Sequence, residues 1–340
     1  MSATHISLKP FNTFGLDAAC QTLVEANSVS ELLQYCLAFQ KRQTPFIVLG
    51  GGSNLLLLEN YQGAVIRIQL KGISVHEDSS FYYLTVAAGE SWHGLVKYCL
   101  SHHMAGLENM ALIPGTVGAA PIQNIGAYGL EFADVCEWVE YLELPGGDIK
   151  RLAASACEFD YRESIFKGEL RDKAVITQVG LKLAKAWQPR LNYGPLQHLA
   201  TDSVSPQQIF DAVCDVRRRK LPDPKVLGNV GSCFKNPIVS AAQYAQLHSE
   251  HGDIAAHPLP SGEVKIAAAW LIDKAGLKGK RFGGVGVHDG QPLVLVNHGD
   301  ATGTDVALAV QSIRARVQSL FGIVLALEPR TYGAQGERRI

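Results

Sequence analysis

The apolar residues of this chain recur at two spacings, and those at the helical period predict five helices. Residues 91–100 are the clearest case, because five apolar side chains fall on one face: Trp92, Leu95, Val96, Cys99 and Leu100. A second helix is expected to begin at Ser205-Pro206, where a capping serine precedes proline at the first helical position, and to end near Lys220. The others are expected at 28–39, with Ser28 or Ser30 as cap, at 263–276 and at about 304–322.

Short apolar runs between turn residues predict the strands. They are expected at 45–49, 55–58, 64–68, 81–88, 135–144, 173–183, 292–297 and 323–327. Residues 71–200 alternate short strands with one helix, whereas residues 206–322 alternate helices with strand. The sequence therefore predicts an α+β fold whose third part is α/β-like.

Composition and charge narrow the class of protein. With 340 residues the chain is long for one ordinary core, so two or three domains are expected. Hydrophobic residues make up 47% and charged residues 19%, and the formal net charge of -1 favours neither nucleic acid nor a membrane surface as partner. The apolar runs are too short to span a membrane, and the N-terminus lacks the layout of a signal peptide. We therefore expect a cytoplasmic protein.

Cysteine and histidine positions argue against disulfides and metal. The seven cysteines are an odd number without a CxxC pair, which is typical of a reducing compartment. His102 and His103 are neighbours in a predicted helical stretch and so point in different directions. His248 and His251 have the right helical spacing but no carboxylate or cysteine cluster beside them. We expect no metal.

Two glycine-rich segments are the first candidates for a binding site. Gly50, Gly51 and Gly52 follow a predicted strand and lead through Ser53 and Asn54 into another. Successive backbone N–H groups in such a loop can hold a pyrophosphate, but a tight strand–strand turn explains the loop equally well. A dinucleotide fingerprint would need GxGxxG opening a helix, and a P-loop would need GK[ST], so neither motif applies.

The second segment, LIPGTVGAAPIQNIGAYG at 112–129, has too many small residues for a periodic core element. Backbone without side chains suits close packing against a flat, extended ligand. Two such cradles fit a large dinucleotide, with the diphosphate in one and the ring system against the other. The alternative is an elaborate loop that binds no ligand.

Three further segments place polar residues in unusual surroundings. GNVGSCFKNP at 228–237 sets Ser232 beside Cys233, in a stretch that its glycines and proline keep from forming a helix. FDYRES contains Tyr161 and Arg162, and LEPR places Glu328 after an apolar run and before a proline that ends the ladder. Taken singly, Tyr161-Arg162 and Glu328 are each better explained by ordinary surface salt bridges.

Four basic residues end the predicted helix before LPDP: Arg217, Arg218, Arg219 and Lys220. Basic side chains at a helix C-terminus are favoured by the helix dipole, which is enough to explain most of them.

These segments occur in the order seen in one family. LKPFNTFG, VLGGGSNLL, NMALIPGTVGAAPIQNIGAYG, FDYRESIFK, KLPDPKVLGNVGSCFKNP and LEPR together resemble the UDP-N-acetylenolpyruvoylglucosamine reductases, also called UDP-N-acetylmuramate dehydrogenases. The resemblance extends from about residue 7 to residue 332. LNYGPL at 191–196 is similar to the longer form of the family, which folds a tyrosine loop over the substrate.

The resemblance implies a flavoenzyme of peptidoglycan precursor synthesis, and hence of cell-wall biogenesis, cell shape and division. It implies bound FAD in a vanillyl-alcohol-oxidase-type fold, with NADPH as reductant. The enolpyruvyl ether of UDP-N-acetylglucosamine then receives hydride at C3 and a proton at C2. The implied domains are FAD-binding subdomain 1 at 1–70, FAD-binding subdomain 2 at 71–205 with 323–340, and a substrate-binding domain at 206–322.

Residue roles follow from the matched motifs. Ser232 matches the proton donor to C2, and Arg162 and Glu328 match the pair that stabilises the charge developing on the substrate carboxylate, with Glu328 protonated and its pKa raised. Cys233 is expected to pack inward, because neighbours on an extended segment alternate faces. The flavin contacts implied are Gly50, Gly51, Gly52, Ser53, Asn54, Pro114, Gly115, Gly118, Asn124, Gly126, Ala127 and Gly129.

The implied substrate contacts are Tyr193, Lys220, Asn236 and Gln291 for the nucleotide, and Tyr128 and Tyr161 beside the flavin or sugar. Nothing in the sequence demands an oligomer, so a monomer is expected. An FAD-dependent alcohol oxidase of the same fold is the first alternative, but it is often flavinylated through histidine or cysteine, and neither glycine-rich segment has a histidine. A UDP-sugar-binding protein without flavin is the second.

Overall fold

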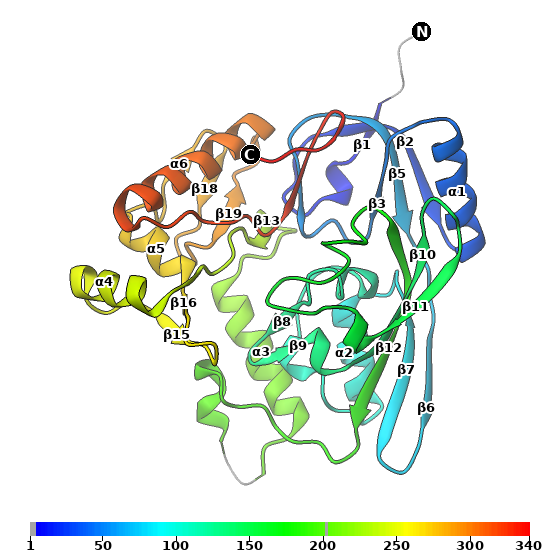
Figure 1. Ribbon diagram of the computed structural model, residues 1–340, viewed down its shortest axis with the longest axis horizontal. Helices are drawn as coiled ribbons and strands as arrows, with labels where there is room; N and C mark the ends of the chain where they lie inside the picture. Colours follow the sequence, from blue (N-terminus) through cyan, green and yellow to red (C-terminus); the bar gives the residue numbers. More distant parts are fainter. Residues whose placement is uncertain (1–4, 201–202) are drawn as a thin grey trace. The chain divides into compact units, whose positions relative to one another are not determined.

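The computed structural model describes residues 5–200 and 203–340, and their contacts divide the chain into two compact units (Figure 1). The first unit comprises residues 1–20, 53–62 and 220–340, and the second comprises 21–52 and 63–219. The division into three domains drawn from the sequence stays a prediction. Residues 1–4 of the chain fall outside the described residues, and with them the first part of the N-terminus for which no signal peptide is expected.

The second unit is built on a five-stranded antiparallel sheet in the order β11-β10-β12-β7-β6. Its strands are β6 (Ile73–Glu77), β7 (Phe81–Ala87), β10 (Cys136–Glu143), β11 (Ile149–Ala153) and β12 (Ala174–Ala184). Apolar residues of the central strands, such as Leu84, Val139 and Val179, are buried in the main core of this unit. Alternation along each strand places these side chains on the covered face of the sheet.

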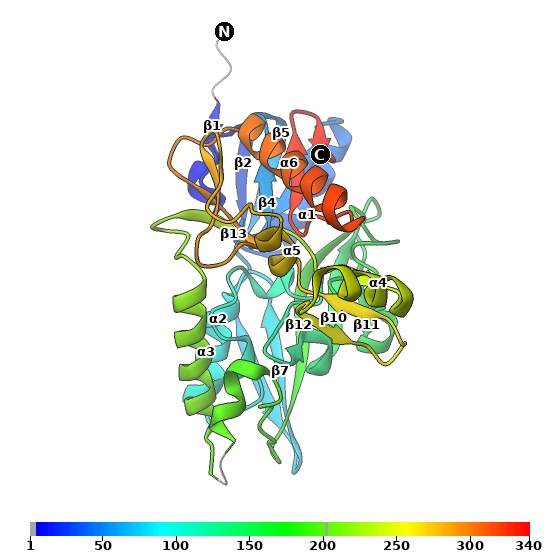
Figure 2. The ribbon, with the colours of Figure 1, turned by 90° about the vertical axis from the view of Figure 1, so that its left-hand side faces the viewer.

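Three helices complete the second unit: α1 (Val29–Lys41), α2 (Trp92–Ser101) and α3 (Pro206–Lys220), whose last residue belongs to the first unit. Ser28 caps α1 by accepting the Glu31 N–H at 3.1 Å. The predicted apolar face of α2 is confirmed, since four of its five residues are buried and Leu100 is half-buried. Helices α2 and α3 lie on the same side of the sheet (Figure 2). They contact each other where His93 stacks on Phe210 with ring centroids 5.6 Å apart.

Strands β2 (Ala19–Ala26) and β5 (Tyr61–Ile68) each begin in the first unit and continue in the second. In the first unit, β1 (Ile6–Ser7) pairs antiparallel with the start of β2. In the second unit, β3 (Phe46–Leu49) pairs in parallel with β5. A small hairpin there joins β8 (Gly126–Ala127) to β9 (Leu130–Glu131).

The first unit contains a four-stranded sheet in the order β13-β19-β18-β17, covered by α5 (Ala268–Lys274) and α6 (Gly303–Phe321). The strands are β13 (Gly228–Ser232), β17 (Arg281–Phe282), β18 (Val285–Val287) and β19 (Val294–Asn297). Phe14, Leu16 and Leu56 are buried in the same core although they come from the N-terminal part of the chain. The predicted helix at 304–322 is confirmed, with Thr302 and Asp305 forming its capping box.

Smaller elements complete the description. In the first unit a three-stranded sheet joins β14 (Ile238–Val239), β16 (Val264–Ile266) and β15 (Ala256–Pro258), beside α4 (Ala241–His251). A second one joins β21 (Gly336–Glu337), β20 (Arg330–Gly333) and β4 (Leu55–Leu57). Short 3-10 helices lie at Lys9–Phe11, Glu108–Met110, Val117–Ala119, Phe132–Asp134, Ala154–Ala156 and Gly194–Leu199. Within the described ranges, no helix has the length and apolar character needed to cross a bilayer.

Two sequence predictions of secondary structure were wrong. The predicted helix at 263–276 begins instead with strand β16, because Val264 and Ile266 are buried and alternate with less buried neighbours, and only Ala268–Lys274 is helical. The predicted strand at 323–327 is extended but pairs only through an isolated bridge between Leu327 and Phe234. Pro329 has no N–H with which to lengthen that ladder.

Candidate functional site

The two glycine-rich segments pack against each other, backbone on backbone, in the second unit. A Cβ added to Gly51 would lie 2.8 Å from the Cα of Gly115, and one added to Gly50 would collide with the Thr116 side chain. Gly52 and Gly115 have φ angles of 64° and 105°, which glycine adopts without strain. Close approach of the two segments thus requires these glycines, and it creates a joint surface with few side chains. Such a surface fits a flat dinucleotide.

The β7–α2 connection and the first residue of α2 fasten the second glycine-rich segment by three backbone hydrogen bonds. The Trp92 N–H donates to the Gly115 carbonyl at 3.1 Å, and the N–H groups of Val117 and Gly118 donate to Glu90 and Ala88 at 2.8 and 2.9 Å. A Cβ on Gly118 would lie 2.5 Å from that of Ala88. Gly118 is therefore needed for packing against the chain itself, whatever else it contacts.

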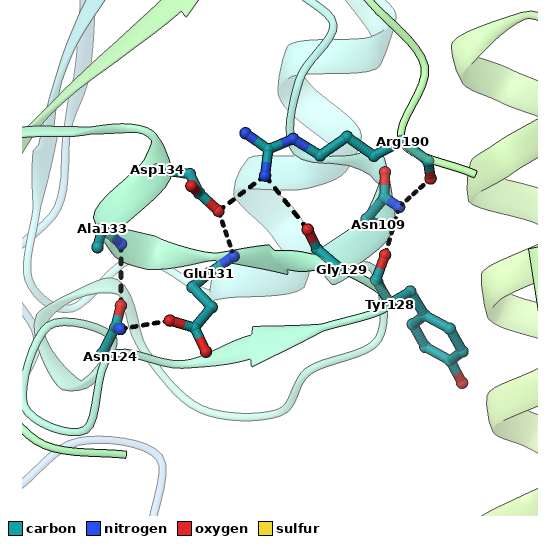
Figure 3. A network of polar contacts seen from close by, with 8 residues as sticks. All are labelled: Asn109, Asn124, Tyr128, Gly129, Glu131, Ala133, Asp134 and Arg190. Atoms are coloured by element: carbon teal, nitrogen blue, oxygen red, sulfur yellow. Dashed lines mark hydrogen bonds and ion pairs between the residues drawn. The ribbon is translucent and has the colours of Figure 1, made fainter. Parts of the chain in front are cut away.

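The end of the segment forms the β8–β9 hairpin, whose two-residue turn is Tyr128-Gly129 (Figure 3). Both turn residues have positive φ, 51° and 81°, as a type I′ turn requires. The Asn109 side chain donates to the Tyr128 and Arg190 carbonyls, both at 2.9 Å, and Arg190 donates to the Gly129 carbonyl at 3.2 Å and to Asp134. These bonds fix the turn and present the Tyr128 ring.

Asn124 supports the same hairpin with its side chain. It is 1% exposed; its Nδ2 donates to Glu131 at 2.8 Å and to the Asp160 carbonyl, and its Oδ1 accepts the Ala133 N–H at 2.9 Å (Figure 3). The amide is thus occupied by the protein itself. Any contact of Asn124 with a cofactor would have to come from its backbone.

Arg162 lies beside this hairpin on a backbone with a φ of 56°, a conformation that a non-glycine residue rarely adopts. Its guanidinium donates to the carbonyls of Gly126 at 2.9 Å and Asn124 at 3.4 Å, and it lies 5.4 Å from the Tyr161 ring centroid. The strain and the two carbonyl contacts hold a positive charge in one place. Strained backbone of this kind is common where geometry serves function.

Arg217 is a second positive charge in this region, which the sequence analysis assigned to the helix dipole. Its Nε is buried without a hydrogen-bond partner among residues 5–200 and 203–340. Burial lowers the pKa of Arg217; Tyr128 counteracts this and the charge of Arg162 adds to it. A helical signal was available, since Arg217 follows the buried Val213 by one turn.

Tyr128 and Tyr193 meet edge to face, with ring centroids 5.5 Å apart. Tyr193 is 51% exposed and directly precedes the 3-10 helix Gly194–Leu199. Burial raises the pKa of Tyr128, while Arg217 lowers it. The second unit therefore gathers two tyrosines and two arginines next to the glycine-rich segments.

In the first unit, Ser232 and Cys233 follow an irregularity in the pairing of β13 with β19. The register shifts between Asn229 and Ser232, and Gly231 within the shift has a φ of 69°. An extra residue of this kind turns the following side chains. Cys233 is fully buried, and burial followed by the charge of Glu328 raises its pKa to about 12. Ser232 is half-buried. The expectation that Cys233 packs inward is confirmed.

Glu328 is fastened by main-chain bonds to the segment that follows Ser232. Its N–H donates to the Cys233 carbonyl at 2.9 Å, and the Lys235 N–H donates to the Ala326 carbonyl at 2.8 Å. Glu328 was expected at the exit of a strand, but it lies after the isolated bridge between Leu327 and Phe234, where these two bonds join the segments. The structure thus places the backbone of Glu328 beside that of Cys233, the neighbour of Ser232, although the two segments are far apart in the sequence.

The remaining predicted residues of the first unit are spread over loops and helix ends. The Asn236 Oδ1 accepts the Ala268 N–H at 2.9 Å, at the start of α5. Gln291 lies in the β18–β19 connection, where its N–H donates to His288 at 3.1 Å. Lys220 ends α3 and is exposed, and its ammonium has no hydrogen bond or ion pair within the described part of the chain. Ser53 and Asn54 also belong to this unit, and the Asn54 carbonyl accepts the Arg330 N–H.

Among the residues that the structure describes, no group of three or more His, Cys, Asp or Glu side chains is placed to hold a metal ion.

Comparison with known proteins gives two family matches. The model described as "FAD binding domain" matches residues 20–153, and the model described as "UDP-N-acetylenolpyruvoylglucosamine reductase, C-terminal domain" matches residues 223–332. The first range contains both glycine-rich segments, and the second contains Ser232, Asn236, Gln291 and Glu328.

Relatives and a solved structure cover almost the whole chain. It is similar to the UDP-N-acetylenolpyruvoylglucosamine reductase of Shewanella sp. (strain ANA-3), with 57% identity over 97% of both chains. The protein of that name from Vibrio cholerae serotype O1 (El Tor Inaba N16961) is 47% identical over 98% of this chain and 96% of its own. The crystal structure of the reductase (MurB) from Thermus caldophilus aligns with a TM-score of 0.66 and 26% identity, covering 96% of this chain and 98% of the other.

Proposed function

Because this chain belongs to the UDP-N-acetylenolpyruvoylglucosamine reductase family, we propose that it reduces the enolpyruvyl ether of UDP-N-acetylglucosamine to UDP-N-acetylmuramate with electrons from NADPH. The predicted FAD-binding α+β fold with its C-terminal domain, the reductase activity and FAD as cofactor are confirmed by the family. The observation that carries the residue assignment is the main-chain attachment of Glu328 to Cys233, the residue after Ser232, with the Cys233 side chain buried in the core. The roles below are proposals.

The two glycine-rich segments are proposed to hold FAD, mainly through their backbones. When bound, FAD supplies the hydride that the enolpyruvyl group receives at C3. The packing of Gly51 on Gly115 supports this assignment, because it brings the backbones of the two segments together without a side chain between them. Pro114, Ala127 and Gly129 extend that surface towards Tyr128.

Arg162 and Glu328 are proposed to stabilise the substrate during hydride addition. Negative charge then develops on the carboxylate next to the double bond, and fixed positive charge and hydrogen-bond donors aimed at it lower the barrier. Arg162 suits the task because its guanidinium is held by two carbonyls. Glu328 would act in its protonated form, donating a hydrogen bond to the carboxylate.

Ser232 is proposed as the proton donor to C2. A serine hydroxyl is a weak acid, but the intermediate after hydride addition is basic, so correct placement of the donor matters more than its acidity. Cys233 is unsuited to the step even though a thiol is the stronger acid in water. It is fully buried, and burial raises its pKa to about 12.

The UDP part of the substrate is proposed to contact Tyr193, Lys220, Asn236 and Gln291, with Tyr128 and Tyr161 nearer the flavin or sugar. The ammonium of Lys220 suits a diphosphate because it is exposed and has no partner in the described part of the chain. Arg217 joins this set as an anion-binding residue, since a buried Nε without a partner in the described part of the chain is costly unless a ligand completes its bonds. The protein is further proposed to act as a cytoplasmic monomer.

An anaerobic titration of the flavin band tests the function. NADPH should bleach the band, and UDP-N-acetylglucosamine enolpyruvate should then restore it with one-to-one stoichiometry. Bleaching without recovery would discard this substrate and favour an alcohol oxidase. A protein that purifies without any flavin band, and gains none with added FAD, would contradict the cofactor.

A further inference from the structure

His93, in the first turn of α2, is joined to the entry of the second glycine-rich segment. Its Nδ1 accepts the N–H of Leu112 at 3.0 Å. Leu112 has a φ of 55°, a conformation that costs about 1–2 kcal/mol for a residue other than glycine. The hydrogen bond therefore holds the chain at a strained point, directly before Pro114 and Gly115.

This segment is attached near α2 by side-chain hydrogen bonds before Gly115 and by backbone hydrogen bonds from Gly115 onwards. From Gly115 onwards it depends on backbone hydrogen bonds to Trp92, Glu90 and Ala88. Before Gly115 it depends on two side chains, since the Trp92 Nε1 donates to the Met110 carbonyl at 3.1 Å and His93 accepts from Leu112. Of these groups only the imidazole can change its charge near neutral pH.

The surroundings of His93 keep the imidazole neutral. It is stacked on Phe210 of α3 with an angle of 6° between the rings. The charged groups that face it are Lys97 on α2 and Arg217 and Arg218 on α3; burial, followed by these three cations, lowers the pKa of His93 below 6.5. A neutral ring can accept at Nδ1, whereas a protonated ring has no acceptor.

We propose that His93 is a positioning residue for FAD, whose neutral Nδ1 holds the entry of the flavin-binding segment in place and releases it on protonation. The proposal rests on the placement of FAD on residues 114–129. It assigns His93 no contact with the substrate. The enzyme would consequently release FAD faster at acidic pH, because of the protonation of one side chain.

The direction of the pH effect follows from the lowered pKa. We call the hydrogen bond between His93 Nδ1 and the Leu112 N–H the clamp. Above pH 6.5 His93 is neutral whether or not the clamp is closed, so the clamp stabilises the segment fully. As the pH falls below 6.5, the open state gains a proton that the closed state resists. The clamp therefore weakens with falling pH until the lowered pKa of the closed state is reached.

The test measures release of FAD from the diluted holoenzyme by the rise in flavin fluorescence, at pH 7.5 and pH 5.5. Wild-type protein should release FAD about fivefold to tenfold faster at the lower pH, the range expected for loss of one hydrogen bond. His93→Asn should release it slowly at both, because the Asn Oδ1 can accept from Leu112 and does not titrate. His93→Phe should release it fast at both.

The matched control is His102→Asn. His102 directly follows the same helix and is exposed, with its Nδ1 near the Tyr98 carbonyl. This variant should behave as the wild type. The proposal is overturned if His93→Asn keeps the wild-type pH dependence, or if His93→Phe releases FAD at the wild-type rates. If His93→Phe fails to fold, His93→Asn decides alone.

Hydrogen exchange of the peptide around Leu112 separates this proposal from the proposed function. Faster exchange in His93→Phe together with faster FAD release supports the clamp. Faster exchange with unchanged release overturns the placement of FAD on this segment, and with it the inference. Neither readout uses NADPH or the UDP-sugar, so the reductase activity is judged separately by the flavin titration.

Discussion

Ser232 and Cys233 show how two neighbouring residues of similar size are given different tasks by burial. The backbone irregularity at Gly231 turns the following residues so that the thiol enters the core and the hydroxyl stays half-buried. Burial also raises the pKa of the thiol to about 12, so at neutral pH it is neither an acid nor a nucleophile of use. The residue with the stronger intrinsic chemistry is thus the structural one.

Ser232→Ala should leave reduction of the flavin by NADPH unchanged and slow its reoxidation by the enolpyruvyl substrate by at least about a hundredfold, the usual contribution of a positioned proton donor. Stopped-flow measurement of the two half-reactions checks this. Cys233→Ala is the matched control and should alter neither rate by more than about twofold. Equal slowing of both half-reactions by Ser232→Ala, or an inactive Cys233→Ala, would reverse the assignment.

Lys220 and Arg218 are close in sequence and both exposed, but Arg218 forms an ion pair with Asp215 at 3.5 Å. Lys220→Ala should therefore raise the KM for the UDP-sugar about tenfold or more while Arg218→Ala changes it little. The KM for NADPH provides the internal comparison. Equal increases for the two variants would mean that the basic run attracts the diphosphate only as a diffuse patch.

Among the structural elements, the two glycine-rich loops are arranged by the close approach of their backbones. Gly51 and Gly115 allow two loops to stack, and neither loop can yield readily, because the second is fastened to α2. The β8–β9 hairpin and the residues from Ala88 to Trp92 together hold the second glycine-rich segment. Its geometry is therefore set largely by neighbouring elements, since its own 3-10 helix (Val117–Ala119) and strand β8 are short.

Gly51→Ala should disturb this stack, since its Cβ would lie 2.8 Å from the Cα of Gly115. We expect the variant to lose about 1–3 kcal/mol of unfolding free energy and to bind FAD more weakly, as measured by denaturant unfolding and flavin fluorescence. Gly168→Ala is the control, because its Cβ would have no neighbour closer than 3.7 Å and its φ is not positive. Similar losses in both variants would refute the stacking argument.

The elements that the sequence predicted well are those with a long, clean period. Helices α2, α3 and α6 match their predictions because each buries one continuous apolar face. The helix at 263–276 was overestimated because three alanines hide the change from alternation at Val264 and Ile266 to helical spacing. Strands β14, β17 and β21 are two residues long and too short to leave a pattern.

At the site, side chains in an unusual local sequence could be predicted from the sequence. Those distinguished only by burial or by a tertiary contact were missed. Ser232, Arg162 and Glu328 lie in unusual local sequences, and family resemblance assigned them roles. Arg217 looked like one of four equivalent basic residues, and only its burial distinguishes it. His93 is one polar residue on a helix, and its bond to Leu112 depends on a fold that local pattern does not predict.

The whole molecule is organised by interleaving, since the first unit combines residues 1–20 and 53–62 with 220–340. Phe14, Leu16 and Leu56 are buried in the core that the C-terminal residues build. Further bonds join the same parts: the Asn229 N–H donates to the Thr13 carbonyl at 2.9 Å, and the Asn297 side chain donates to the Phe14 carbonyl at 2.9 Å. The C-terminal family match at 223–332 therefore falls short of a complete folding unit.

A fragment of residues 220–340 should accordingly fail to unfold cooperatively. Losing three large buried side chains costs about 2–5 kcal/mol for each, which is comparable with the whole stability of an ordinary domain. Differential scanning calorimetry of the fragment and the full chain checks this. A fragment with a sharp transition near that of the full chain would show that residues 220–340 are self-sufficient.

Interleaving also constrains how such a chain is made and inherited. When residue 219 has been translated, residues 1–20 and 53–62 still lack their core partners, so the first unit is completed only after residues 220–340 have been made. A gene encoding this arrangement cannot exchange its 3′ portion by recombination at one point without also mismatching two short stretches near its 5′ end. Changes in the first unit are therefore expected to arise more readily by point mutation within the existing chain than by import of a foreign module.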